Sequence, residues 1–356
     1  MIEQSIDSVS GKIGWMCSFV PEEMILAAGL TPSRIQGRVE AIERADAYAF
    51  TNLCPYVKNL LDSGLRHKFD GMAGVVFANS CDGMRRLSDL WRHYVGTPFS
   101  YLLEVPKNRN VDAINYFAAR LRDLRNSLEA AFGVEITDEK LQVAIGIMNE
   151  HRTLIGRIFE AQKEDPPRYV GSELLSILNA EGVQPKGETT VLLRDSAMGG
   201  ASPAPGGRGG PRLLVAGSRL DRPALFEMVE AAGGSIVAID TCNGLRHYTG
   251  LVEDSADPID ALARRYLLTP ACPRMPGFGT RMERLATLAG EYGAQGIIYG
   301  MLKFCDFSLF EQPQVEKLSQ EVGLPVLVLE NDYVWSDAER LRTRIEAFLE
   351  MIGSEL

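Results

Sequence analysis

From residue 212 onward, the chain alternates short apolar runs with longer amphipathic segments, and this alternation limits the fold more than any other feature. Strands buried in a parallel sheet are short continuous apolar runs, and consecutive parallel strands need a long crossover, usually a helix. The apolar runs are RLLVAG, SIVAID, QGIIYGML and LPVLVLEN, and each is followed by a segment with helical spacing. This half is therefore expected to form a parallel sheet with helices on both faces.

The N-terminal half has the same character with more helix. Its expected strands are GWMCSFV, GVVFAN and FSYLLEV, and its expected helices include PEEMILAAG, CPYVKNLLDSG and DGMRRLSDLWRHY. Residues 112–162 contain two long segments with apolar residues spaced by three and four, which predict a helical layer. The expected fold is α/β, with two Rossmann-like (flavodoxin-like) parallel-sheet domains and that added layer.

A Gly- and Pro-rich stretch, GGASPAPGGRGGP, separates the halves. No expected strand leads into it and no Gly-Lys-Ser/Thr ends it, so a linker or loop suits it better than a phosphate-binding loop. We predict an N-terminal α/β domain with a helical insertion over residues 1–198, a linker or loop over 199–211, and a C-terminal α/β domain over 212–356.

Length and charge narrow the class of protein. A chain of 356 residues is long enough for two domains. A net charge of −10 argues against a nucleic-acid groove or an anionic membrane surface as the main partner. No signal segment and no uncharged run of membrane-spanning length is apparent. We expect a cytoplasmic protein that binds neither nucleic acid nor membrane.

Six cysteines are spread along the chain without any CxxC pair. Their wide spacing argues against a disulfide framework, a zinc ribbon or a thioredoxin-like site. Three of them, Cys54, Cys81 and Cys305, open segments that we expect to be helices. The amino end of a helix carries a partial positive charge, which lowers a thiol's pKa and favours the thiolate that metal ligation needs.

These three cysteines have two interpretations. Three thiolates could hold an iron–sulfur cluster with one iron open to another ligand, whereas free cysteines are often small buried hydrophobes. An internal similarity between GVVFANSCDGMRRL and GIIYGMLKFCDFSLF places Cys81 and Cys305 at equivalent strand ends, where open α/β sheets bind ligands. Spacing alone leaves both interpretations open.

Several flanking motifs resemble those of the 2-hydroxyacyl-CoA dehydratase and benzoyl-CoA reductase family. In chain order they are MCSFVPEEMILAAG, NLCPYVKN, ANSCDGMRRLSDLW, DTCNGLRHY, DPIDALARRYL, ACPRMP and LKFCDFSLFEQPQVEKLSQEVGLPVLVLENDY. The resemblance runs from about residue 13 to the end of the sequence and is most specific over 302–333.

The resemblance implies a subunit similar to the D component of these dehydratases, with Cys54, Cys81 and Cys305 binding an oxygen-sensitive [4Fe-4S] cluster. It also implies a dimer with a homologous second subunit or with a second copy, and an ATP-dependent iron–sulfur activator protein as electron donor. The substrate would be an acyl-CoA, which loses its 2-hydroxyl as water through a ketyl radical.

Related families imply alternatives for the cluster and the activity of this chain. Double-cubane reductases hold an [8Fe-9S] cluster with additional cysteines, and Cys242, Cys272 and Cys17 would supply them here. The sequence is also compatible with an ATP-dependent reductase of the benzoyl-CoA type and with a non-catalytic electron-transfer homologue.

Three residues are weak catalytic candidates. Glu330 ends the last expected strand and could orient substrate or cap the following helix. Arg246 and His247 could contact CoA phosphates or a thioester oxygen, or could form salt bridges instead.

Overall fold

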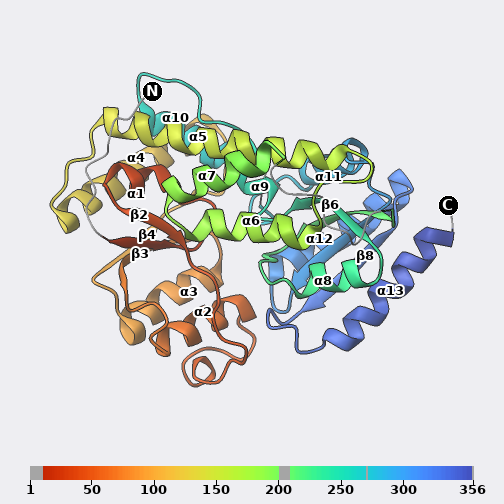
Figure 1. Cartoon of the computed structure of the whole chain (residues 1–356). Coiled ribbons are helices and arrows are strands. Elements are labelled where there is room, and N and C mark those ends of the chain that lie inside the picture. Colours follow the sequence, from red (N-terminus) through yellow and green to blue (C-terminus); the bar gives the residue numbers. More distant parts are fainter. Residues whose placement is uncertain (1–10, 200–208, 270–271, 355–356) are drawn as a thin grey trace.

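The computed structural model describes residues 11–199, 209–269 and 272–354 (Figure 1). Two four-stranded sheets form its centre, and every strand pair in them is parallel. The first sheet contains β1 (Lys12–Trp15), β2 (Thr31–Arg34), β3 (Met72–Ala78) and β4 (Phe99–Leu103), and the second contains β5 (Arg212–Gly217), β6 (Ser235–Asp240), β7 (Gly296–Leu302) and β8 (Val326–Asn331).

Both sheets have the same topology. The spatial orders are β2-β1-β3-β4 and β6-β5-β7-β8, so each sheet places its first strand between its second and third. This is the flavodoxin-like order, whose switch point lies between the first and third strands. The predicted fold class is confirmed, and the two halves are topological repeats.

Helices cover the sheets. Those that precede β5 are α1 (Glu22–Ala27), α2 (Pro55–Leu65), α3 (Asp82–Leu90), α4 (Val111–Phe132), α5 (Asp138–Glu160), α6 (Gly171–Val183) and α7 (Lys186–Ala197), with short helical turns η1 (Ala45–Ala47), η2 (Trp91–Val95) and η3 (Ala161–Lys163). Those that follow are α8 (Ala224–Ala231), α9 (Leu245–Tyr248), α10 (Pro258–Leu268), α11 (Phe278–Glu291), α12 (Asp306–Val322) and α13 (Ala338–Ser354).

The two long helices predicted within residues 112–162 are present as α4 and α5. Figure 1 shows α5, α6 and α7 as one helical layer that runs alongside both sheets, and α6 contacts β2 of the first sheet and β6 of the second. The long helices α4 and α5 begin where side-chain caps satisfy their first N–H groups, because Asn110 accepts from the Ala113 amide and Thr137 accepts from the Lys140 amide. Helices α6 and α7 were not predicted from the sequence.

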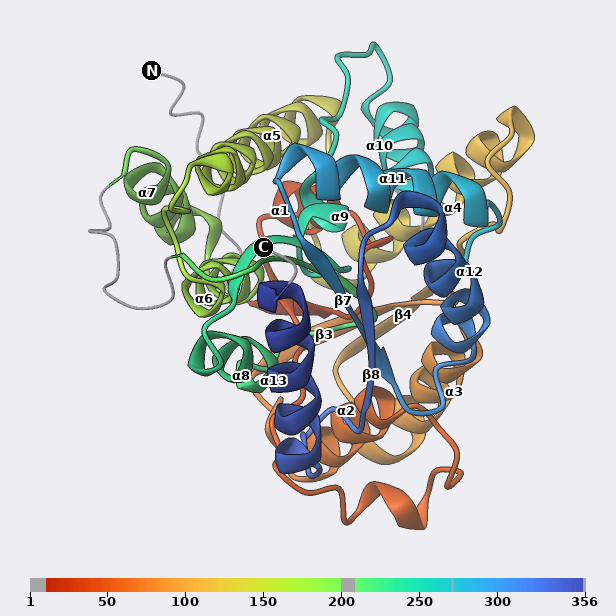
Figure 2. The same ribbon diagram turned by 90° about the vertical axis from the view of Figure 1, so that its right-hand side faces the viewer.

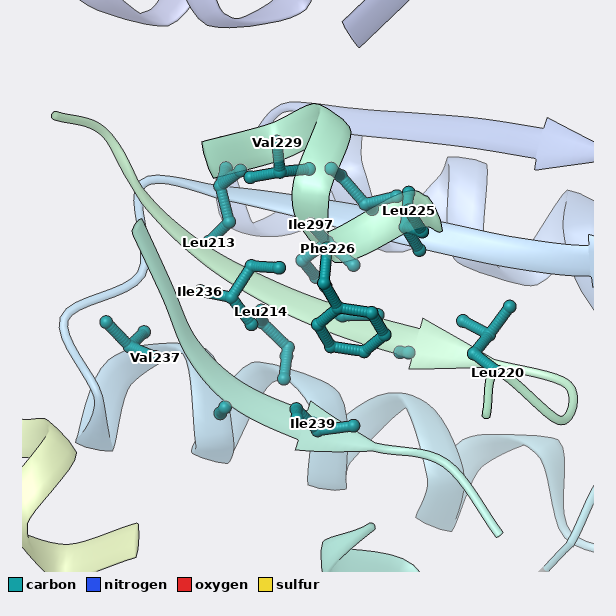
Figure 3. Close-up of a cluster of buried hydrophobic side chains, with 14 of the residues drawn as sticks. Leu213, Leu214, Leu220, Leu225, Phe226, Val229, Ile236, Val237, Ile239 and Ile297 are labelled. Carbon is teal, nitrogen blue, oxygen red and sulfur yellow. The ribbon is translucent and has the colours of Figure 1, made fainter. Parts of the chain in front are cut away.

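The apolar strands of the second sheet fill a core with α8. Figure 3 shows Phe226 and Val229 of α8 lying over β5 and β6, and both side chains are buried. Residues of this sheet are buried on both faces, which explains why its strands are continuous apolar runs.

The cores of the two halves exchange segments. Leu262 and Tyr266 of α10 pack in the N-terminal core with Leu121 of α4, although α10 follows β6 in the chain. Conversely, Leu174 and Leu178 of α6 pack in the C-terminal core. Figure 2 shows α10 beside α4, away from β8. The domain bounds stay a prediction, and residues 200–208 of the expected linker lie outside the described residues.

Two local predictions differ from the structure. Strand β1 ends at Trp15, so Cys17 lies in the loop after it rather than within a strand. Strand β2, with the sequence TPSR, was missed because it has no apolar run. Within the described residues, no helix combines the length and apolar character that a membrane span requires.

Candidate functional site

The carboxyl ends of the two sheets meet at a cavity of about 300 Å³. Loops that follow β1 and β3 line it from one side, and loops that follow β5, β6 and β7 line it from the other. Strands β1 and β3 are neighbours, as are β5 and β7, so the cavity lies at the switch point of both sheets. Ligands of open α/β sheets bind at such points.

All six cysteines of the chain line this one cavity: Cys17, Cys54, Cys81, Cys242, Cys272 and Cys305. All are free thiols. They come from six separate segments of the chain, which the packing of the two halves brings together. The cavity is therefore the candidate functional site.

The expected helix-start positions of three cysteines are confirmed. Cys54, Cys81 and Cys305 immediately precede α2, α3 and α12, and the Cys81 thiol accepts a hydrogen bond from the Met84 amide at 3.4 Å. Cys81 and Cys305 each follow the last residue of a strand by three positions, after Ala78 in β3 and Leu302 in β7. The internal sequence similarity thus corresponds to equivalent positions in the two sheets.

Backbone geometry beside Cys305 is unusual. Phe304 has φ of 58°, in the left-handed region that non-glycine residues rarely adopt. Such conformations persist where the surrounding structure imposes them, and they occur often at functional sites. On the neighbouring strand of the same sheet, Gly217 at the end of β5 lies so close to Gly300 of β7 that a Cβ at Gly217 would be 2.1 Å from the Gly300 carbonyl oxygen.

Burial, together with the neighbouring thiols of Cys305 and Cys81, raises the pKa of the Cys54 thiol to about 12. The amides of Val57 and Tyr56 act in the opposite direction but do not outweigh burial. The amides at the start of α2 thus act in the expected direction, although the net shift of the Cys54 pKa is upward. A thiolate there needs additional positive charge, such as that of a metal ion.

Arg274 is a cavity residue that sequence reasoning missed. Its Nη1 donates a hydrogen bond to the Cys272 thiol at 3.1 Å. Burial would raise the pKa of Cys272, but Arg274 and Arg246 outweigh it and lower that pKa. The available signal was the position of Arg274 two residues after a cysteine in ACPRMP.

The donor set suits an iron–sulfur cluster, since thiolates at helix starts are soft ligands in a partly positive field. In the ranges that the structure describes, no three His, Cys, Asp or Glu side chains form a compact group ready to hold a metal ion. The cysteines share a cavity without forming a preassembled ligand cage.

The three catalytic candidates differ in position. Arg246 and His247 line the cavity, whereas Glu330 is exposed on β8 and is not brought to it. Arg246 Nη2 donates hydrogen bonds to the carbonyl oxygens of Asp240 at 2.6 Å and Gly217 at 3.1 Å. It therefore connects the carboxyl ends of β6 and β5 at the cavity. His247 pairs with Glu22, at 3.2 Å between Nε2 and Oε1.

These features define a class of protein: two flavodoxin-like sheets with a cysteine-lined site between their carboxyl ends. Over residues 17–352 the chain matches the family described as 2-hydroxyglutaryl-CoA dehydratase, D-component, and it belongs to that family. The resemblance noted in the sequence is thus confirmed.

Known relatives are of similar length. The chain is 27% identical over 341 residues to the (R)-phenyllactyl-CoA dehydratase beta subunit of Clostridium sporogenes. This match covers 96% of the present chain and 91% of the relative. It is 27% identical over 323 residues to a subunit of the benzoyl-CoA reductase of Thauera aromatica, covering 88% and 84%. It is 25% identical over 352 residues to the (R)-2-hydroxyglutaryl-CoA dehydratase beta subunit of Acidaminococcus fermentans, covering 96% and 92%.

Proposed function

We propose that this chain is the [4Fe-4S] subunit of a 2-hydroxyacyl-CoA dehydratase-type enzyme. It would remove water from a 2-hydroxyacyl-CoA after one-electron reduction by an ATP-dependent iron–sulfur activator protein. The observation that carries the proposal is the convergence of Cys54, Cys81 and Cys305, each at a helix start, on one cavity at the switch points of both sheets. The names of the family and of the dehydratase relatives support the reaction class.

The chemistry of the reaction explains why such a site is needed. Elimination of a hydroxyl next to a thioester carbonyl is difficult, because hydroxide is a poor leaving group and because the proton that must also be lost, at C3, is not acidic. A cluster held by three thiolates would supply a one-electron relay and an iron that has no protein ligand. One electron added to the thioester gives a ketyl radical, from which the hydroxyl can depart. The chain's own residues would bind the cluster, orient the acyl group and exclude water.

A second subunit is part of the proposal. Phe50 and Phe304 line the cavity yet are 68% and 49% exposed, and exposed aromatic residues at a site are typical of a surface that another protein covers. Two of the relatives are named as dehydratase beta subunits. A homologous subunit or a second copy of this chain would cover the exposed side of the cavity at Phe50 and Phe304.

The proposal is tested by anaerobic purification with iron and sulfide quantitation and electron paramagnetic resonance spectroscopy. We expect about four iron atoms per chain, as a single cubane requires. Cys54→Ser, Cys81→Ser and Cys305→Ser should each lose iron, while the matched variants Cys17→Ser, Cys242→Ser and Cys272→Ser should keep it. Iron-free wild-type protein from anaerobic cells would overturn the proposal.

One observation favours a second candidate, a reductase with an [8Fe-9S] double cubane. The cavity is lined by all six cysteines, the smallest number that two three-thiolate cubanes need. About eight iron atoms per chain, with iron lost in all six serine variants, would establish this second candidate.

Activity assays with the partner subunit and activator separate the remaining outcomes. They should include 2-hydroxyacyl-CoA and benzoyl-CoA thioesters, because one relative is a subunit of benzoyl-CoA reductase. Dehydration supports the leading proposal, ring reduction supports a reductase, and neither reaction from iron-loaded protein indicates an electron-transfer role.

A further inference from the structure

Arg274 differs from the other arginines that line the cavity in the described part of the chain. Arg219 and Arg246 each form an ion pair with an aspartate, and Arg265 donates hydrogen bonds to three backbone carbonyl oxygens. Arg274 forms no ion pair with a carboxylate of the described residues, although its side chain is only partly exposed. A partly buried cation without an anionic partner is costly, so its charge needs a different counterpart.

Two contacts direct the guanidinium of Arg274 to the wall of the cavity. Its Nη1 donates a hydrogen bond to the Cys272 thiol at 3.1 Å. Its Cζ lies 5.9 Å from the centre of the ring of Phe307, in the first turn of α12, which Cys305 immediately precedes. Arg274, Cys272 and Phe307 all line the cavity. The guanidinium therefore extends from the segment before α11 to the start of α12.

The charges that act on Arg274 come from thiols of both halves. Burial would lower the pKa of the guanidinium, but Cys81, Cys272, Cys305 and Cys17 together outweigh burial and raise that pKa. Cys81 follows β3 of the first sheet, whereas Cys305 follows β7 of the second. Arg274 thus interacts with thiols of the two sheets, including two of the three that we propose as cluster ligands.

The state of the cysteines decides whether the charge of Arg274 is balanced, because an arginine stays protonated in proteins. Protonated thiols are neutral and leave the guanidinium without a counter-ion. Thiolates are anions, and three of them outweigh the positive charge of a cubane core. Such a site is negative and becomes more negative when it accepts an electron. A fixed cation beside it therefore stabilises the reduced state more than the oxidised state.

We propose that Arg274 is the counter-cation of the cysteine-lined cavity, and that it stabilises the thiolates and raises the reduction potential of the cluster they would hold. This inference rests on the proposed function. In the electron transfer the activator protein loses one electron and the cluster gains it, while the guanidinium keeps its proton. Arg274 is a positioning residue, because it acts through the charge of the ligands and not on the substrate.

The first test uses the full-length chain without iron. Titration with Cd²⁺ reports bound thiolates by the sulfur-to-metal charge-transfer absorption, and three thiolates around Cd²⁺ leave a negative site. We expect Arg274→Gln and Arg274→Met to weaken Cd²⁺ binding by about tenfold, as the loss of a hydrogen bond to a charged group implies. Either variant that folds by circular dichroism serves the test. Arg274→Lys keeps the charge and should retain most of the affinity.

Lys107 provides a matched control. Its Nζ lies 5.9 Å from the centre of the same Phe307 ring, but its side chain is exposed and does not line the cavity. Because solvent and salt screen an exposed charge, Lys107→Gln should bind Cd²⁺ as tightly as the wild type. Wild-type affinity in Arg274→Gln, or an equal loss in Lys107→Gln, would overturn the counter-cation.

The second test uses the iron-loaded chain. Reduction of the cluster is followed by electron paramagnetic resonance spectroscopy at a series of fixed potentials. With iron content unchanged, Arg274→Gln should shift the reduction potential downward by about 59 mV, which is a tenfold change in the equilibrium for one electron. Arg274→Lys and Lys107→Gln should stay close to the wild-type potential. An unchanged potential in iron-loaded Arg274→Gln would overturn the proposal.

The two tests separate this inference from the proposed function. Iron-free wild-type protein from anaerobic cells would count against the proposed function, and the Cd²⁺ titration then decides on Arg274. Iron-loaded wild-type protein whose potential does not depend on Arg274 would overturn the counter-cation and leave the proposed function standing.

Discussion

Buried charges meet in the helical layer beside the cavity. Glu23 on α1 pairs with Arg152 on α5 at 2.5 Å and accepts a hydrogen bond from Tyr266 on α10 at 2.7 Å. Both charged side chains are almost fully buried. A buried ion pair adds little stability relative to an apolar pair, but removing one partner leaves a charge without compensation.

Arg152→Met is therefore expected to lower the free energy of unfolding by about 3–5 kcal/mol, because Glu23 would remain buried without its cation. The double variant Glu23→Gln with Arg152→Met removes both charges and should recover much of that loss. Urea unfolding monitored by circular dichroism measures both. A double variant no more stable than Arg152→Met alone would contradict the assigned pairing.

Helix α10 joins the two halves at the scale of elements. Its chain position lies between β6 and β7 of the second sheet, yet Leu262 packs in the core of the first half with α4. Asp257 caps its start by accepting from the Ile259 and Asp260 amides, and Arg122 of α4 pairs with Asp257 at 2.7 Å and Asp260 at 2.9 Å. The helix is thus fixed to the N-terminal half at its start and along its apolar face.

Leu262→Ala should destabilise the protein by about 2–5 kcal/mol, because it leaves a cavity in a fully buried position. The matched control is Leu268→Ala on the same helix, whose side chain is 47% exposed and whose loss should change stability by no more than about 0.5 kcal/mol. Denaturant unfolding of both variants provides the measurement. Equal effects of the two substitutions would show that α10 does not contribute to the N-terminal core.

At the scale of the whole molecule, the exchange of helices and the buried charges bind the two sheets into one unit. Glu23 belongs to the N-terminal half and Glu181 to α6, which packs in the C-terminal core. Burial would raise the pKa of each carboxyl, but Arg152, Arg265 and Tyr266 together outweigh burial for Glu23, and Lys186 with His151 outweighs it for Glu181. Both pKa values are consequently lowered from 4.5.

Acid should therefore destabilise both halves together. A carboxyl whose pKa is lower in the folded than in the unfolded state contributes stability above the unfolded value of 4.5, and this contribution is lost as the pH falls through the folded pKa. Unfolding followed at Trp15 and Trp91 should coincide with unfolding followed at Trp335 as the pH falls below about 4.5, in variants that keep only one set of tryptophans. Two separate transitions would show that the halves unfold independently.

Much of the architecture follows from local sequence patterns. The four strands of the second sheet were predicted because buried parallel strands are continuous apolar runs, and the helix starts at Cys54, Cys81 and Cys305 were predicted from neighbouring turn and cap residues. The polar strand β2 and the four-residue helix α9 were missed, because neither carries a periodic apolar signal. Local pattern therefore determined the class of fold and three candidate thiols.

The composition of the site was decided only by tertiary structure. That Cys17, Cys242 and Cys272 share the cavity, that Glu330 does not reach it, and that Glu22 meets His247 depend on how two sheets and a helical layer pack. Glu22 and His247 are 225 positions apart, and neither has a local signature. A sequence segment determines its own periodicity and caps, whereas a cavity wall is formed by side chains from distant segments, whose contacts arise only once the cores are packed.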